Sequence, residues 1–349
     1  MRYKMKTNRN PKKRRLAALS FAGVLAALAV CSCSKDAPSG ASGGEPQPQG
    51  RPIELQGMFG QEKTGAAPDL KAPVDGGPVV GGEETTPELT LWFTRADETA
   101  SGAYGAYETT QLSAVRPAAE GNTPTALTFA DPSPCYQLGG LKTRLTGWFP
   151  GGGAEGSEKG YWNGTSVQWT IDGKQDIMTA PAQQGSNAEA MPTLVFSHRT
   201  AQLRFYAYAE TENIAALWGK ITAIRVSGQA NVCTYTPSTD GATGAVVFSG
   251  SPVVFAAGMN AAAAPSVTTD KAAARQTGES VMIAPQASAY ALALEVESDK
   301  LGTIPVTLPA RVYDPAGAYN IYLRLQAVTI SPAVAVSDWG ATVEKDVEL

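Results

Sequence analysis

A nine-residue alternation of apolar and polar side chains constrains the fold of this chain more than any other feature. Between residues 201 and 209 the apolar set is Leu203, Phe205, Ala207 and Ala209. The alternating set is Gln202, Arg204, Tyr206 and Tyr208. A period of two is typical of a β-strand with one face on a core. Leu194, Phe196 and His198 hold the opposite parity. The pattern therefore slips near residues 199–201, which predicts a bulge or a strand that moves between sheets.

Short runs of the same kind recur from residue 88 to the end, separated by Gly, Pro, Asn, Asp and Ser. Asp172-Gly173 follows one such run and predicts a hairpin turn leading to Ile177-Met178. No run of ten or more residues shows helical periodicity. Many short strands with closely spaced turns favour an all-β fold made of sandwiches.

The first 32 residues have the pattern of an export signal. Basic residues from Arg2 to Arg15 precede the apolar run Leu16–Val30, which is too short for an ordinary membrane span. A cysteine directly after such a run is the bacterial lipoprotein arrangement, so we expect lipid attachment at Cys33, with Cys31 as the alternative. The small Ser32 before Cys33 favours Cys33, whereas the position of Leu28 favours Cys31.

Removal of residues 1–32 makes the protein strongly acidic. The full chain has 28 Lys+Arg and 32 Asp+Glu; eight of the basic residues lie in the first 32 positions, so the charge changes from −4 to 20 − 32 = −12. This acidity speaks against nucleic acid as a partner, because neutralisation of phosphates needs a basic face. We expect the acyl chains to provide membrane attachment.

Residues 33–87 are rich in Gly and Pro and predict a flexible tether or pro-segment. Within them, Ile53, Leu55 and Phe59 hint at a short strand after Arg51. The remaining length is comfortable for two sandwiches. The polar stretch 179–193 predicts the boundary, which gives an N-terminal β-sandwich at 88–185 and a C-terminal β-sandwich at 186–349.

Several local motifs resemble the fimbrillin-like (Mfa-like, FimA-type) family of Bacteroidetes outer-membrane lipoproteins. They are the run from Ile171 to Met178, the run from Phe196 to Phe205, and the shorter Gly147–Pro150, Trp218–Ile221 and Asp338–Gly340. The resemblance covers residues 88–349. It implies two transthyretin-like β-sandwich domains in tandem and the role of a cell-surface pilus (fimbrium) subunit or accessory protein.

The end of the chain predicts a terminal strand, because Val343, Val347 and Leu349 share one parity. The family resemblance implies assembly by strand exchange: an arginine-directed protease removes the first strand of the N-terminal domain, and a neighbour's C-terminal strand replaces it. Arg95, just after the run Leu89–Phe93, and Arg51 are the candidate cleavage sites. Val343, Val347 and Leu349 are the candidate donor residues.

The sequence offers little for catalysis or metal binding. His198 is the only histidine, and its parity favours a structural role at the end of a strand. Asp172 and Asp176 are interpreted as solvated turn residues. We therefore expect no enzymatic activity, no cofactor and no metal. Cys135 and Cys233 are expected to be separate thiols, because they fall in different predicted domains.

The alternative hypothesis is a tethered glycan- or matrix-binding lipoprotein that does not polymerise. Tyr161 and Trp162 lie in a glycine-rich stretch and are candidates for an aromatic platform. Under the first hypothesis the partners are other fimbrillin-like subunits, the membrane through the acyl chains, and a host or bacterial surface ligand. The sequence leaves open a stalk, tip or anchor role, the adhesion target and the protease.

Overall fold

The computed structural model describes residues 50–60, 85–86, 88–120, 123–130, 132–240, 242–260, 264, 266–327 and 329–338. The described chain is nearly all β, as the alternating runs predict. Its one α-helix is α1 (Glu212–Trp218), whose N-cap Thr211 accepts a hydrogen bond from Ile214. No helix in these ranges is long and apolar enough to cross a membrane. The signal peptide, Cys31, Cys33, Val343, Val347 and Leu349 lie outside the described residues.

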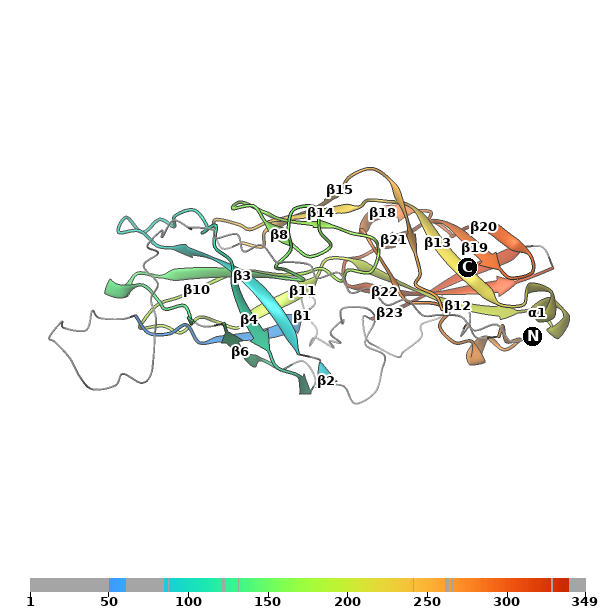
Figure 1. The fold of residues 1–349 in the computed structure, drawn as a ribbon, viewed down its shortest axis with the longest axis horizontal. Coiled ribbons are helices and arrows are strands. Elements are labelled where there is room, and N and C mark those ends of the chain that lie inside the picture. The colour runs from blue at the N-terminus through green and yellow to red at the C-terminus, as the bar shows by residue number, and fades with distance from the viewer. Residues whose placement is uncertain are drawn as a thin grey trace, which may run out of the picture.

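A closed barrel forms one end of the elongated molecule (Figure 1). Its strands, in order around the barrel, are β1 (Leu55–Gly60), β11 (Leu194–His198), β10 (Met178–Gly185), β7 (Thr143–Phe149), β3 (Leu89–Asp97), β4 (Leu112–Arg116) and β6 (Thr125–Phe129). Neighbouring strands are antiparallel, except that β1 runs parallel to β11. The two-residue strands β2 (Thr85–Thr86) and β5 (Ala119–Glu120) pair beside it. The strand hinted at by Ile53, Leu55 and Phe59 is confirmed as β1.

Two four-stranded sheets form a sandwich at the other end. One contains β17 (Val281–Ile283), β12 (Ala201–Ala209), β22 (Gly317–Leu325) and β23 (Ile330–Asp338). The second contains β16 (Val253–Ala256), β13 (Ile221–Gln229), β19 (Ala293–Ser298) and β20 (Gly302–Thr307). Phe205 and Ile321 from the first sheet share one apolar core with Ile224 and Val296 from the second. Burial of these alternate side chains holds the two sheets together.

A third sheet lies between the barrel and the sandwich. Its order is β15 (Ala245–Ser249), β14 (Val232–Thr236), β9 (Val167–Thr170) and β8 (Tyr161–Trp162). The ribbon β18 (Gln286–Tyr290) and β21 (Arg311–Tyr313) is a separate two-stranded sheet. The predicted division at 185/186 does not separate the sheets. β9 lies before it and pairs with β14, which lies after it, and the barrel strand β11 also lies after it. The polar stretch 179–193 includes all of β10 except Met178, and the connection to β11.

The parity slip marks a change of sheet. β11 ends at His198 in the barrel, and β12 begins at Ala201 in the sandwich. Of the two alternatives, the strand that moves between sheets is therefore correct. The hairpin predicted at Asp172-Gly173 is wrong: β9 pairs with β8 and β14, and the chain after the turn enters the barrel. Hydrogen bonds between Asp172 and Gln175 close this turn without a paired strand.

Candidate functional site: the strand that closes the barrel

β1 occupies a slot between β6 and β11. Its register with β11 runs from Gly57 opposite Leu194 to Gly60 opposite Ser197, and Leu55 lies opposite Leu127 of β6. Leu55 and Phe59 are buried in the barrel core. A side chain at Gly57 would come within 3.2 Å of Leu127, so the small residue permits close packing against β6. β1 therefore supplies both ladder hydrogen bonds and alternate core side chains.

Phe59 has the most extensive contacts in the strand. It is 1% exposed, its ring packs edge-on against Phe196 with centroids 6.3 Å apart, and the guanidinium of Arg116 lies 4.6 Å from its ring centre. Arg116 is itself buried, and burial lowers its pKa. The aromatic and cationic contacts make Phe59 the principal anchor of β1.

The residues before β1 continue its pairing. The amide of Ile53 donates to the Pro134 carbonyl at 2.9 Å, and the amide of Tyr136 donates to the Arg51 carbonyl at 2.9 Å. The amide of Arg51 donates to the side chain of Asn187 at 2.8 Å. The backbone on both sides of the Arg51 carbonyl is therefore hydrogen bonded, and cleavage at Arg51 requires local opening.

Arg95 lies inside a strand, because β3 continues four residues past the predicted end at Phe93 to Asp97. Its side chain is 16% exposed and makes two hydrogen bonds to the Asp97 carboxylate, at 2.8 and 2.7 Å. A third hydrogen bond reaches the Cys135 carbonyl at 2.9 Å. Arg95 thereby ties β3 to the segment that pairs with the residues before β1. A protease must open β3 to reach it.

Neither candidate cleavage site separates β1 from the next barrel strand in sequence. Arg51 precedes β1, and Arg95 lies within β3. Residues 61–88, which connect the two strands in the chain, contain lysine but no arginine. Cleavage at Arg51 leaves β1 attached to the rest of the protein, whereas cleavage at Arg95 also divides β3.

The proposed aromatic platform is part of the core. Trp162 is 4% exposed, stacks on Trp148 with centroids 5.7 Å apart and meets Tyr107 edge-on. Its indole N–H donates to the Glu108 carbonyl at 2.9 Å. Trp162 is thus packed inside the protein, whereas Tyr161 is half-buried.

A buried imidazole–carboxylate pair connects the end of β11 to the turn after β9. Nδ1 of His198 lies 2.9 and 3.0 Å from the two oxygens of Asp176, and both side chains are buried. Next to it, the amide of Arg199 donates to the Ile177 carbonyl at 2.7 Å. The structural role expected of His198 fits this position. The interpretation of Asp176 as a solvated residue is wrong, because its side chain is buried against the imidazole of His198.

The two described cysteines are both buried, and no disulfide joins them. Burial raises the pKa of the Cys233 thiol to about 12. In the described parts of the chain, no group of three or more His, Cys, Asp or Glu side chains is arranged to hold a metal ion.

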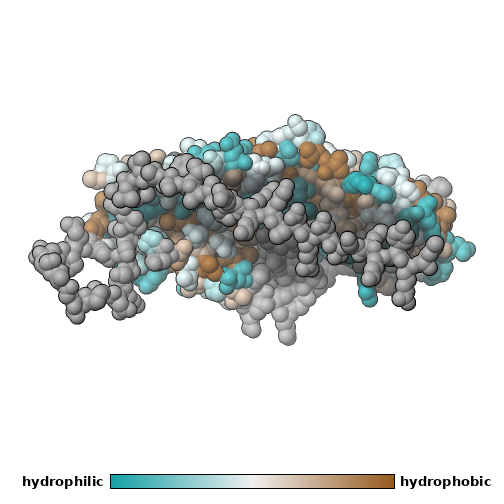
Figure 2. Space-filling view, in the orientation of Figure 1, coloured by the Kyte–Doolittle hydropathy of each residue, from teal (hydrophilic) through white to brown (hydrophobic). Residues whose placement is uncertain are grey.

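A groove of about 540 Å³ with both polar and apolar lining lies beside β15. Its lining includes Val246, Val247 and Phe248 of β15, Pro285 and Pro315, and the polar Arg199 and Gln286. Figure 2 shows brown, hydrophobic side chains gathered in this region of the surface, where Val247 is 55% exposed. Among the described residues, β15 pairs only with β14, so its edge is open beside this groove.

The fold is similar to that of two bacterial proteins of known structure. A candidate cell adhesion protein from Bacteroides uniformis aligns with a TM-score of 0.54 at 12% identity, covering 84% of this chain and 100% of that one. A second candidate cell adhesion protein, from Bacteroides ovatus, aligns with a TM-score of 0.51 at 16% identity, covering 84% and 99%. A search of curated protein sequences finds no significant match.

The sequence itself identifies the family. The model of the fimbrillin-like family matches residues 85–339. The chain therefore belongs to the fimbrillin-like family, as the motifs around residues 171–205 predict.

Proposed function

We propose that the protein is a cell-surface subunit of a fimbrial-type adhesive structure and that it assembles by β-strand complementation. The observation that carries the proposal is the position of β1. It is the first described strand, it closes the barrel between β6 and β11, and 28 residues of sequence separate it from the next barrel strand. Membership of the fimbrillin-like family supports the fimbrial role.

Loss of β1 would open a slot with the properties that strand complementation requires. β6 and β11 would each expose a row of backbone donors and acceptors, and the sites of Leu55 and Phe59 would become apolar pockets. An incoming strand gains affinity from the backbone hydrogen bonds and register from alternate side chains. A replacement strand that runs in the direction of β1 would be parallel to β11 and antiparallel to β6.

The C-terminal segment of a second copy is the proposed donor. Val347 and Leu349 have the same spacing as Gly57 and Phe59, so both could point into the barrel in one register. Before assembly, acylation at Cys33, or at Cys31, tethers the protein to the outer membrane through the segment before β1. Release of β1 would therefore also release the subunit from its tether.

Controlled cleavage between β1 and β3 tests the proposal. A recognition sequence for a specific protease is introduced within residues 61–84 of the chain, and the cleaved protein is mixed with a synthetic peptide of residues 339–349. We expect the peptide to displace the β1 fragment and the cleaved protein alone to form a ladder of multiples that resists mild detergent. A peptide with Val347→Asp and Leu349→Asp is the matched control. A cleaved protein that stays monomeric and binds neither peptide refutes strand complementation.

Native maturation is tested separately with an arginine-specific protease. Fragment masses from the wild type, Arg51→Gln and Arg95→Gln show which bond is cut. Because both backbones are hydrogen bonded in the fold, we expect cleavage to be slow and to accelerate in mild denaturant. Rapid cleavage of the native protein at either residue contradicts this expectation.

A further inference from the structure

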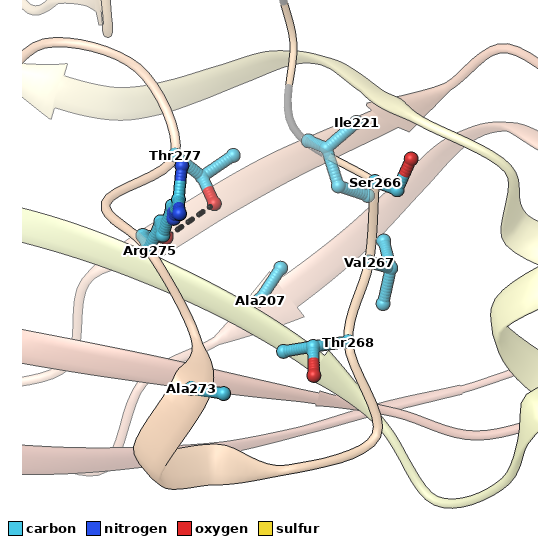
Figure 3. A pocket seen from close by; sticks show the side chains of 8 residues that line it. All are labelled: Ala207, Ile221, Ser266, Val267, Thr268, Ala273, Arg275 and Thr277. Atoms are coloured by element: carbon cyan, nitrogen blue, oxygen red, sulfur yellow. Dashed lines mark hydrogen bonds between the residues drawn. The ribbon is translucent and has the colours of Figure 1, made fainter.

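A small cavity opens at the far end of the molecule from the barrel, between the edge of β12 and the loop 266–277 (Figure 3). The loop is joined to the strand by two isolated bridges, Tyr206 with Gln276 and Tyr208 with Thr268. The amide of Thr277 donates to the Phe205 carbonyl at 2.7 Å, and the amide of Ala209 donates to the Thr268 carbonyl at 2.8 Å. These bonds hold the loop away from the side chain of Ala207 and leave about 260 Å³ between them.

The cavity combines an apolar floor with a hydroxyl-bearing wall. Ala207 of β12, Ile221 of β13 and Val267 supply the methyl groups. Ser266, Thr268 and Thr277 supply three hydroxyls on the loop side. Thr268 accepts a hydrogen bond from the Asp270 amide, and Thr277 donates to the Arg275 carbonyl at 3.4 Å. Since a hydroxyl has one donor and two acceptor positions, each can make a further hydrogen bond.

Arg275 gives the rim a positive charge. Its side chain is exposed beside Thr277. In the described structure, no carboxylate forms an ion pair with it. Two acidic side chains make hydrogen bonds to the loop: Asp270 accepts from the Ala272 amide at 2.9 Å, and Glu212 accepts from the Thr269 hydroxyl at 3.2 Å. In a protein with an excess of acidic residues, an unpaired arginine at the rim of a hydroxyl-lined cavity favours an anionic ligand.

The size of the cavity limits the ligand to one small molecule. Ligand pockets for drug-sized molecules begin at roughly 300 Å³, and this cavity is slightly smaller. A single acidic sugar ring satisfies all three features: C–H groups face the methyl floor, hydroxyls meet the threonines and serine, and a carboxylate reaches Arg275. We propose that this cavity binds a carboxylated monosaccharide, such as a terminal uronic or sialic acid residue of a glycan.

The cavity lies in the sandwich and shares no residue with β1, β6 or β11. Sugar binding and strand complementation are therefore independent. Failure of the strand-exchange experiment leaves this proposal standing, and failure of sugar binding leaves assembly unaffected.

Binding is measured on the full chain by calorimetry and ligand-observed NMR, with galacturonic acid and N-acetylneuraminic acid as probes. Galactose and N-acetylgalactosamine are the neutral comparisons, and propionate is the simple carboxylate. We expect millimolar or tighter binding of at least one acidic sugar, with neutral sugars and propionate at least about tenfold weaker, since each loses one set of polar contacts. Binding should also weaken as salt is raised.

Two variants at the exposed rim locate the site. Arg275→Gln removes the charge, and Ala273→Tyr places a ring at the mouth; each is expected to reduce affinity at least about tenfold. Lys159→Gln removes an exposed positive charge elsewhere and is expected to bind as the wild type does. Thermal unfolding checks that all three are folded. The proposal is overturned if no acidic sugar binds, if neutral sugars or propionate bind equally well, or if Arg275→Gln and Ala273→Tyr bind like Lys159→Gln.

Discussion

Truncation of Phe59 to alanine tests directly whether β1 is held as a core strand. Phe59 is 1% exposed and contacts Phe196 and Arg116 inside the barrel. Replacing a fully buried phenylalanine by alanine costs about 3–5 kcal/mol, from lost transfer energy and the cavity that remains. If the barrel unfolds as one unit, the whole loss appears in the free energy of unfolding. If β1 detaches first, about 3 kcal/mol raises the population of the detached state roughly 100-fold.

Urea unfolding and amide hydrogen exchange separate the two cases. Urea unfolding gives the loss in the global free energy of unfolding. Amide hydrogen exchange shows whether β1, β6 and β11 open more often than β3 and β7. Met58→Ala is the matched control, because Met58 is the next residue of the same strand but points out of the core and is partly exposed. We expect this control to lose less than about 1 kcal/mol. Two results would refute the placement of β1 as a core strand of the barrel. One is an equal loss of unfolding free energy in Phe59→Ala and Met58→Ala, and the other is no faster amide exchange in β6 and β11 for Phe59→Ala.

Three further predictions concern the rest of the molecule. His198→Ala removes one partner of a buried pair and should cost about 3–5 kcal/mol in urea unfolding; adding Asp176→Asn should recover part of this loss, and strict additivity would contradict a direct interaction. The Cys233 thiol, with its pKa raised to about 12 from the ordinary 9.0, should resist alkylation in the folded protein. The thiol of the unfolded chain ionises at a lower pH than the buried thiol of the folded protein. The stability contributed by Cys233 is therefore complete below pH 9 and declines as the pH rises toward 12. Unfolding curves at a series of pH values should show this decline in the wild type and not in Cys233→Ala. Thr211→Ala removes the N-cap of α1 and should cost about 1 kcal/mol, while Thr211→Ser should be close to neutral.

Local patterns in the sequence predict much of this fold. The alternation at residues 201–209 identifies β12 and its buried face, and the change of parity near Arg199 identifies the crossing from barrel to sandwich. These features follow from the pleat of a strand, which nearby residues alone determine. The family motifs coincide with the same region, including the His198 and Asp176 pair.

Pairing between distant segments is what local patterns leave undetermined. Asp172-Gly173 has the composition of a hairpin turn, yet β9 pairs with the preceding β8 and with β14, more than sixty residues later. Trp162 sits in a glycine-rich stretch that suggests a surface loop, but it contacts Trp148 of β7 and Tyr107 of the connection between β3 and β4. Asp176 is polar and next to a turn, and only the approach of His198 explains its burial. In each case a contact distant in sequence overrides the local preference.

The third sheet has a mechanical consequence. Two compact halves of a chain are usually joined by a flexible linker and can reorient freely. Here β9, which precedes the barrel strand β10 in the chain, is hydrogen bonded to β14, which follows the sandwich strand β13. The ladder covers residues 167–170 and 232–235. A pulling force applied to opposite ends of the molecule must break this ladder before the halves can separate or bend. This ladder therefore resists reorientation of the two halves under tension.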